Sequence, residues 1–249
     1  MTAEGQVSLP TPPSLESLLQ EGPVALFLDF DGTLVELAPG PDQIEPIADL
    51  NAKLVQMAER LGGRCAIVSG RAIADIESHI GEISLAAAGS HGSDVRSADG
   101  RALGEAPTGL PAALEAELRS YASENAIDYE AKPHGGALHY RSNPQAGEAA
   151  QAFAQDLAAR HGWSAQSGKC VVELVAGKAD KGTAVRALMQ EEPFAGARPI
   201  FIGDDLTDEK GFAACNEAGG AGILVGTREP TCAQYQLPNV ASVHQWLGL

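Results

Sequence analysis

The sequence lacks an apolar run long enough to cross a membrane, and it has few basic residues for its 249-residue length. A membrane-spanning helix needs about 20 consecutive apolar residues, and none occurs. Seventeen Lys and Arg residues stand against 33 Asp and Glu residues, which gives a formal net charge of −16. This charge repels nucleic-acid phosphates, and no basic block interleaved with aromatic residues offsets it. We therefore expect neither a membrane protein nor a nucleic-acid-binding protein.

Cysteine is also scarce, with four residues at positions 65, 170, 215 and 232. They form no close pair and no spacing typical of zinc ligands, so we expect reduced, mostly structural thiols and no zinc site. The first residues, MTAEGQVSLPTPPSLESLLQ, have neither the basic start nor the apolar middle of a secretory signal. These features predict a cytoplasmic protein.

Short continuous apolar runs, each followed by a turn and a helical pattern, recur along the chain. Such runs are typical of strands in a parallel sheet that is covered on both faces. Residues 46–62 show helical spacing and end at two glycines, which favour a helix stop. This alternation predicts an α/β fold. The runs are VALFL (24–28), CAIVS (65–69), LAAAG (85–89) and PIFIG (199–203).

The pattern changes in the middle of the chain. Residues 110–126 and 143–162 have helical periodicity, whereas 135–142 and 169–176 are strand-like. The earlier alternation of strand and helix patterns then resumes, as expected when one domain is inserted into another. We predict a flexible segment over residues 1–20, a core domain of residues 21–98 and 177–249, and an inserted α+β domain of residues 99–176.

Polar residues follow several of the predicted core strands. The stretch LFLDFDGTLVE ends an apolar run in two carboxylates, and a hydroxyl, an ammonium group and an acidic pair occupy similar positions later. Ligands bind at the carboxyl edge of an open parallel sheet, so these groups are expected to converge. Together they suit Mg²⁺-assisted phosphoryl transfer through an aspartyl-phosphate. The residues are Asp29, Asp31, Ser69, Lys181, Asp204 and Asp205.

Each member of this set also has an ordinary structural interpretation. An Asp after a strand is more often a turn former or helix cap than a nucleophile. The SGR at 69–71 would serve as a helix cap, and Lys181 as a solvated lysine at a helix end. The order of DFDGTL, SGR, KG and GDDLTDE along the chain favours the catalytic interpretation.

These motifs resemble those of a known superfamily. DFDGTL (29–34), Ser69, Lys181 and GDDLTDE (203–209) are similar to the four motifs of the haloacid dehalogenase superfamily. The segments 87–92, 130–141, 168–182 and 201–212 further resemble the trehalose-6-phosphate phosphatase family. The resemblance implies a Rossmann-like parallel-sheet hydrolase core with an inserted α+β cap domain.

The resemblance also implies roles for residues of the core. Asp29 would attack phosphorus, and Asp31 would act as general acid and then general base. Mg²⁺ would bind Asp29, the backbone carbonyl of Asp31 and Asp204, with Asp205 and Asp208 orienting these ligands. The phosphoryl oxygens and the substrate would be held by Ser69, Lys181, Thr33, Gly70 and Arg71.

Further residues match sugar-binding positions of the family. Mixed acidic and basic groups suit the recognition of sugar hydroxyls. Alternation along residues 135–142 places His139 and Arg141 on one face of a strand and Tyr140 on the other. The alternative interpretation is a set of solvated charges at strand edges, and a lone histidine is more often structural than a ligand. The predicted set is His91, Glu130, Lys132, His139, Arg141, Lys169 and Glu173.

The resemblance implies a cytoplasmic Mg²⁺-dependent phosphatase that converts trehalose 6-phosphate to trehalose and phosphate, with functional coupling to the synthase that makes the substrate. Two alternatives stay open. The first is a phosphatase of sucrose 6-phosphate or a glycosyl phosphoglycerate, which would share every core motif. The second is a catalytically silent sugar-phosphate sensor, against which the intact acidic residues and Lys181 argue.

Overall fold

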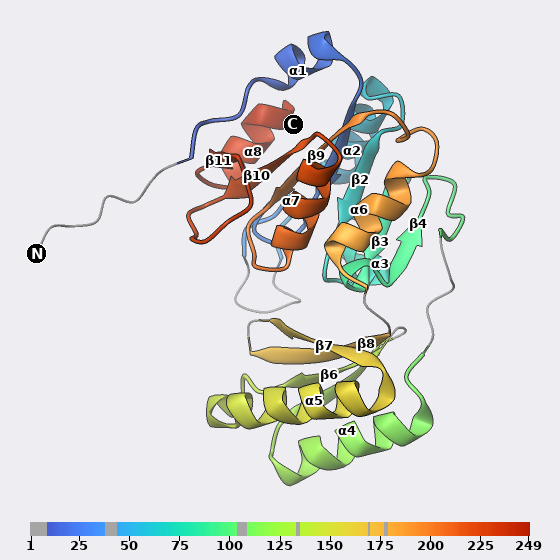
Figure 1. The fold of residues 1–249 in the computed structure, drawn as a ribbon, viewed down its shortest axis with the longest axis vertical. Coiled ribbons are helices and arrows are strands. Elements are labelled where there is room, and N and C mark those ends of the chain that lie inside the picture. Colours follow the sequence, from blue (N-terminus) through green and yellow to red (C-terminus); the bar gives the residue numbers. More distant parts are fainter. Residues whose placement is uncertain (1–8, 38–43, 104–108, 133–134, 169, 177–178) are drawn as a thin grey trace, which may run out of the picture. The chain divides into compact units, whose positions relative to one another are not determined.

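The computed structural model describes residues 9–37, 44–103, 109–132, 135–168, 170–176 and 179–249 (Figure 1). The chain divides into two compact units. Unit 1 consists of Met1–Gly104 and Asp180–Leu249, and unit 2 of Glu105–Ala179. Unit 2 is therefore inserted between the two halves of unit 1, at boundaries a few residues beyond the predicted 99 and 176.

Among the described residues of unit 1, seven strands form one sheet in the order β11-β10-β9-β1-β2-β3-β4. All neighbours run parallel except β3 and β4. β1 and β2 are buried along their whole length, and β9 is buried after its first residue, Arg198, as the continuous apolar runs predict. The strands are β1 (Val24–Leu28), β2 (Cys65–Val68), β3 (Ala86–Gly89), β4 (Asp94–Arg96), β9 (Arg198–Gly203), β10 (Ala221–Val225) and β11 (Tyr235–Leu237).

Helices cover both faces of this sheet. One hydrophobic cluster joins α1, α2, α3 and α8 to alternate strand residues such as Leu26 and Ile200, and a second joins α6 and α7 to Phe27 and Phe201. The helices are α1 (Leu15–Glu21), α2 (Leu50–Arg60), α3 (Ile73–Ile80), α6 (Lys181–Met189), α7 (Asp208–Glu217) and α8 (Val240–Leu247), with a 3₁₀ turn at Ser90–Gly92. The described part of the chain contains no helix that meets the length and hydropathy of a membrane span.

The structure differs from the predicted flexible segment of residues 1–20. Residues 9–20 are ordered, because Leu15 and Leu18 of α1 are buried in the core and the Trp246 Nε1–H group donates to the Pro13 carbonyl at 2.8 Å. The Ser14 hydroxyl caps α1 by accepting from the Ser17 amide. A composition rich in Pro and Ser hides this anchoring, and residues 1–8 lie outside the described residues.

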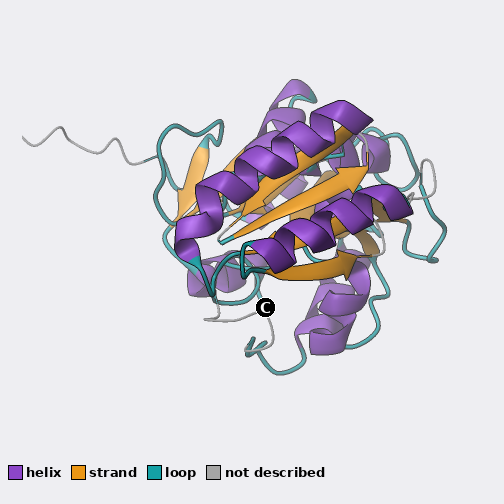
Figure 2. Ribbon diagram, turned by 90° about the horizontal axis from the view of Figure 1, so that it is seen from below, coloured by secondary structure: helices purple, strands orange, loops and turns teal. Residues whose placement is uncertain are grey.

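Unit 2 is a four-stranded antiparallel sheet, in the order β5-β6-β8-β7 of its described strands, with two helices on one face (Figure 2). Leu118, Leu138, Leu157 and Leu174 lie in the core between the helices and the sheet. The strand β7 has no counterpart among the predicted elements. The elements are α4 (Ala112–Glu124), β5 (Asp128–Lys132), β6 (Gly135–His139), a 3₁₀ turn (Pro144–Ala146), α5 (Gly147–His161), β7 (Trp163–Gly168) and β8 (Val171–Ala176).

Candidate active site

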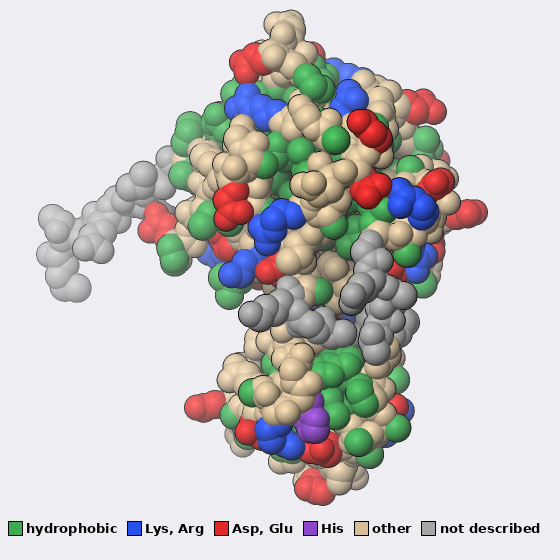
Figure 3. All heavy atoms as spheres, turned by 45° about the vertical axis from the view of Figure 1, so that its right-hand side comes forward, with side chains coloured by type: hydrophobic (Ala, Val, Ile, Leu, Met, Phe, Trp, Pro, Cys, Tyr) green, Lys and Arg blue, Asp and Glu red, His purple; other side chains and the backbone are tan. Residues whose placement is uncertain are grey.

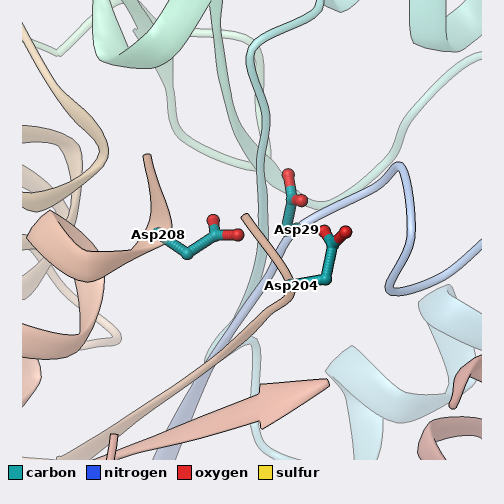
Figure 4. A group of neighbouring side chains, drawn as sticks. All are labelled: Asp29, Asp204 and Asp208. Atoms are coloured by element: carbon teal, nitrogen blue, oxygen red, sulfur yellow. The ribbon is translucent and has the colours of Figure 1, made fainter. Parts of the chain in front are cut away.

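Three carboxylates meet at the carboxyl edge of the sheet in unit 1. Asp29 follows β1 and Asp204 follows β9, and these strands are hydrogen-bonded neighbours that pair Leu28 with Ile202. Asp208 is the first residue of α7. One oxygen of each of the three carboxylates lies within 4.8 Å of the others, and Figure 4 shows the three side chains beside one another. Strand pairing thus brings together Asp29 and Asp204, which are 175 positions apart in the sequence.

The Lys181 ammonium group connects two of these carboxylates. Its Nζ donates to Asp29 Oδ1 at 2.7 Å and to Asp208 Oδ1 at 2.6 Å. Lys181 is the first residue of α6, whose start is fixed by a capping box between Asp180 and Thr183. The side chain is 3% exposed, and its two counter-charges compensate for the removal of the ammonium from water.

Burial and mutual repulsion act on the acidic group. Burial raises the pKa of the Asp29 carboxyl well above its usual range, Asp208 adds to this, and Lys181 opposes it. Burial, and then the charge of Asp208, raise the pKa of Asp204 to about 7. Burial alone would lower the pKa of Lys181, but Asp208 and Asp29 outweigh it and raise that pKa. One ammonium therefore faces three carboxylates, and a further cation would relieve their repulsion.

The donor set fits a divalent metal ion. The Asp204 Oδ1 atom is buried and has no hydrogen-bond partner in the described part of the chain. Gly32 leaves room for this carboxylate, since a Cβ there would lie 2.2 Å from Asp204 Oδ2. Hard carboxylate oxygens are the ligands that Mg²⁺ prefers. The cluster is therefore a candidate Mg²⁺ site.

The Asp31 carboxylate is held outside this cluster by Arg71. The guanidinium donates from Nε to Asp31 Oδ2 at 2.6 Å and from Nη2 to Oδ1 at 2.9 Å. Its Nη1 donates to Asp75 Oδ2 at 2.6 Å. Arg71, predicted to bind substrate, thus makes a bidentate contact with the predicted general acid and base. The predicted metal contact of Asp31 uses its backbone carbonyl and is independent of this side-chain pair.

The predicted phosphate-binding groups line the ends of β2 and β1. Ser69 is 1% exposed, and its Oγ accepts from the Arg71 amide at 3.1 Å. The His91 ring packs against Gly70, because a Cβ on Gly70 would lie 2.5 Å from His91 Cε1. Thr33 is fully buried, and its Oγ1 has no hydrogen-bond partner among the described residues. A buried hydroxyl without a partner suits a ligand oxygen.

Four of the predicted sugar-binding residues lie on the face of the unit 2 sheet opposite its helices, namely Glu130, Lys132, His139 and Glu173, whereas His91 lies in unit 1. Strand register aligns Glu130, Ala137 and Glu173 in one row across β5, β6 and β8. Lys132 forms an ion pair with Glu173 and lies 4.0 Å from Glu130. His139 Nε2 lies 2.8 Å from the Glu130 carboxylate. Figure 3 shows charged and apolar side chains interspersed over one face of the molecule.

Two other predicted residues stand apart from this row. Arg141 follows β6 and is exposed, whereas Lys169 lies outside the described residues. Tyr140 is buried and packs in the core of unit 2, on the side away from His139. Because β6 ends at His139, Arg141 lies beyond the strand, and the shared face predicted for His139 and Arg141 stays a prediction.

Comparisons with known proteins identify the family of the chain. The sequence model of the trehalose-phosphatase family matches residues 27–241. The chain belongs to this family. A trehalose-6-phosphate phosphatase of Escherichia coli K12 is 35% identical over 242 residues, which cover 96% of this chain and 91% of that protein. A probable trehalose-phosphate phosphatase of Sinorhizobium fredii is 37% identical over 228 residues, 90% of this chain and 85% of that one.

Solved structures support the fold of this trehalose-phosphatase family member. The C-terminal domain of a Candida albicans trehalose-6-phosphate phosphatase superposes with a TM-score of 0.80 at 22% identity, covering 98% of this chain and all of that one. A haloacid dehalogenase-like hydrolase of Bacillus subtilis gives 0.65 at 15% identity, covering 91% and 99%. The predicted family and fold class are confirmed.

The structure also reveals site residues that sequence reasoning missed. Arg228, from the loop after β10, donates from Nη2 to the Asp205 carbonyl at 2.9 Å. Gln166 of β7 is the register partner of Glu173 and donates to the Ala179 carbonyl at 2.7 Å. Neither residue belongs to a recognisable motif, and each reaches its site only through strand pairing. No signal in the sequence distinguishes them from other loop or edge residues.

Proposed function

We propose that this chain is a Mg²⁺-dependent phosphatase that hydrolyses trehalose 6-phosphate to trehalose and phosphate. The observation that carries the proposal is the buried Lys181 ammonium between Asp29 and Asp208, with Asp204 beside them. A structural ion pair needs one carboxylate, whereas this cluster keeps three around one cation. The name of the Escherichia coli relative, over 91% of its length, supports the substrate.

The first chemical step is attack by Asp29 on phosphorus. Lys181 holds Asp29 Oδ1, which fixes the carboxylate and leaves Oδ2 to form the new bond. As the Oδ2–P bond forms, the bond from phosphorus to the sugar oxygen breaks, and Asp31 gives that oxygen a proton. The Lys181 charge, together with Ser69 and the Gly70 amide, stabilises the phosphoryl oxygens.

The second step hydrolyses the aspartyl-phosphate. Asp31 removes a proton from water, the water oxygen bonds to phosphorus, and the Oδ2–P bond breaks to regenerate Asp29. The Asp31 carboxylate is 29% exposed, so it can exchange protons with solvent between the two steps. Arg71 keeps both of its oxygens in a defined direction.

A bound Mg²⁺ would be held by Asp29, Asp204 and the Asp31 carbonyl and would supply charge neutralisation for the transferring phosphoryl group. The sugar would be recognised by unit 2. Glu130, Lys132 and Glu173 offer paired donors and acceptors on one face, which suits hydroxyl groups better than an apolar ligand. Arg141 and Lys169 are assigned to the same role from the family resemblance.

We also propose a cytoplasmic location and functional coupling to trehalose-6-phosphate synthase. Four free cysteines support a reducing compartment. One structural neighbour is the C-terminal domain of a Candida albicans trehalose synthase regulatory protein, with a TM-score of 0.70 at 10% identity, covering 96% of this chain and 99% of that one. This likeness concerns the fold, and the intact acidic cluster favours the enzyme over a silent sensor.

A substrate panel tests the proposed function. Phosphate release from trehalose 6-phosphate should exceed release from sucrose 6-phosphate and a glucosyl phosphoglycerate by about a hundredfold in kcat/KM, because unpaired buried polar groups penalise the wrong sugar. EDTA should stop the reaction and added Mg²⁺ should restore it. A preference for another ester would assign a different sugar, and tight binding of trehalose 6-phosphate without turnover would support the silent sensor.

Magnesium affinity should rise with pH between 6 and 8. The pKa of Asp204 is raised to about 7 in the metal-free protein, and Mg²⁺ binds the ionised carboxylate, so protons compete with the metal below that pH. The apparent affinity should change by about tenfold per pH unit below 7 through Asp204. Calorimetric titration in two buffers of different ionisation enthalpy measures both affinity and proton release. An affinity independent of pH would contradict the assignment of Asp204 as a ligand.

A further inference from the structure

We propose that Arg228 is a positioning residue for the metal site, and that it fixes the loop between β9 and α7 in the geometry that Mg²⁺ requires. This inference rests on the proposed use of Mg²⁺. The loop carries Asp204 and Asp205 and leads into Asp208, so its conformation sets where the Asp204 carboxylate lies. Nothing in the sequence marks Arg228, which follows the neighbouring strand β10.

Arg228 holds this loop at two points. Its Nη2 donates to the Asp205 carbonyl oxygen at 2.9 Å and lies 2.8 Å from Glu209 Oε1 in an ion pair. The other oxygen of Glu209, Oε2, accepts from the Cys232 amide at 2.6 Å. The segment from Arg228 to Cys232 is therefore fastened to the metal-site loop and to the start of α7. β9 and β10 are parallel neighbours, which brings the loops that follow them to the same edge.

The Asp205 residue is held from both sides. Its carbonyl accepts from Arg228, and its amide donates to Asp208 Oδ2 at 2.8 Å. The other oxygen of Asp208 accepts from Lys181, which in turn holds Asp29. Asp204 precedes this fixed residue directly, so little backbone freedom remains between the fixed amide of Asp205 and the Asp204 carboxylate. Arg228 thus closes a chain of contacts that begins at the predicted nucleophile.

The burial of Arg228 indicates that the contact is not a surface ion pair. Its side chain is 23% exposed, and its Nε and Nη1 atoms are buried without hydrogen-bond partners among the described residues. Desolvating guanidinium donors without partners costs free energy. The Glu209 carboxylate and the acidic loop offset this cost, and the single nitrogen Nη2 makes the contacts that restrain the loop.

Arg228 acts on Mg²⁺ binding in two opposite ways. Its positive charge disfavours a nearby cation, whereas its restraint of the loop reduces the ordering that Mg²⁺ must impose to reach octahedral geometry. We infer that the restraint outweighs the charge. The two effects can be separated, because Lys keeps the charge on a side chain one atom too short to place its nitrogen where Nη2 lies, and Met removes both the charge and the donor.

The test measures Mg²⁺ affinity of the metal-free protein by calorimetry at pH 8 for R228K and R228M. R228K should weaken Mg²⁺ binding by about tenfold, equivalent to ~1.4 kcal/mol, and R228M should weaken it less because the opposing charge is gone. Mg²⁺ dependence of aryl-phosphate hydrolysis should shift in parallel, and excess Mg²⁺ should restore kcat to within a few-fold of the parent. Melting temperatures without Mg²⁺ report any general loss of stability.

Arg198 provides a matched control. It forms a single ion pair with Glu21 at 2.9 Å, and its Nε is likewise buried without a partner in the described part of the chain, but it begins β9 at the opposite edge of the sheet. R198K should leave Mg²⁺ affinity unchanged. The inference would be overturned if R228K and R228M both bound Mg²⁺ with an affinity within twofold of the parent. It would also be overturned if R228M bound Mg²⁺ more tightly than the parent while R228K bound it equally well. Because the readout is Mg²⁺ affinity, an incorrect choice of sugar would not affect it.

Discussion

Replacing Asp29 by Asn should lower kcat for trehalose 6-phosphate by at least about a thousandfold, equivalent to ~4 kcal/mol in barrier. An amide cannot form the acyl-phosphate on which both steps depend. The side-chain oxygen of Asn can still accept from Lys181, whose second counter-charge, Asp208, remains. The substitution also removes one of three clustered carboxylates, so the fold should persist. Phosphate release, thermal melting and mass spectrometry for a phosphorylated intermediate measure these effects.

A matched control for the loss of one carboxylate is Asp156→Asn. Asp156 lies on α5 with a side chain that is 68% exposed, and it pairs with Arg160 of the same helix. This variant should keep the parent rate within about twofold, as expected for a surface substitution. If Asp29→Asn kept its turnover within about tenfold of the parent, a rise of ~1.4 kcal/mol in the barrier, Asp29 would be ruled out as the nucleophile.

Replacing Glu173 by Ala should lower kcat/KM for trehalose 6-phosphate on the order of a hundredfold, because a site built for hydroxyls leaves polar groups unpaired when one partner is lost. Glu173 is 7% exposed and forms an ion pair with Lys132. After its removal, the carboxylate nearest to Lys132 among the described residues is the more distant Glu130, at 4.0 Å. Hydrolysis of a small aryl phosphate, which lacks the sugar, should fall by a few-fold at most, since the lost contact is specific to the sugar.

Glu117→Ala is the control for Glu173→Ala. Glu117 lies on α4 of the same unit and also pairs with a cation, Arg160, at 3.3 Å, but it is 42% exposed and on the helical side. Its removal should change neither substrate's kcat/KM beyond about twofold. If Glu173→Ala lowered both rates equally, Glu173 would support the fold or the core chemistry, and the assignment of the sugar site to this face would fail.

The sequence by itself determined the fold class, the family and the residues of the central cluster. Strands buried on both faces must be continuously apolar, so β1, β2, β3 and β9 were visible as short runs. Their polar endings were visible for the same reason, because a buried strand tolerates Asp29 or Asp204 only where it leaves the core. Parallel pairing then places those endings at one edge.

Local sequence patterns could not show which polar residues of the site pair with one another. Asp29 and Lys181 are 152 positions apart, and Asp31 and Arg71 are 40 apart. Each pair depends on strand order and side-chain direction. The sequence placed Arg71 among the substrate ligands, and the structure adds that its guanidinium contacts Asp31 and Asp75. Which carboxylate pairs with a given cation depends on their distance in the folded chain. The sequence offers 33 Asp and Glu residues for 17 Lys and Arg residues, so it does not decide the pairs.

Only the tertiary structure decided the elements and residues whose signals are weak. The amphipathic character of α1 is carried by a few leucines and is obscured by Pro and Ser, yet Leu15 and Leu18 anchor it to the core. The edge strand β7 is partly exposed and has no apolar run, so it exists through its pairing with β8. Arg228 is a single residue in a loop, and it reaches the metal-site loop because β9 and β10 are neighbours. For α1 and Arg228 the contacts join distant parts of the chain, and β7 is formed by pairing with the next strand, β8, so none of them shows as an apolar run or a motif.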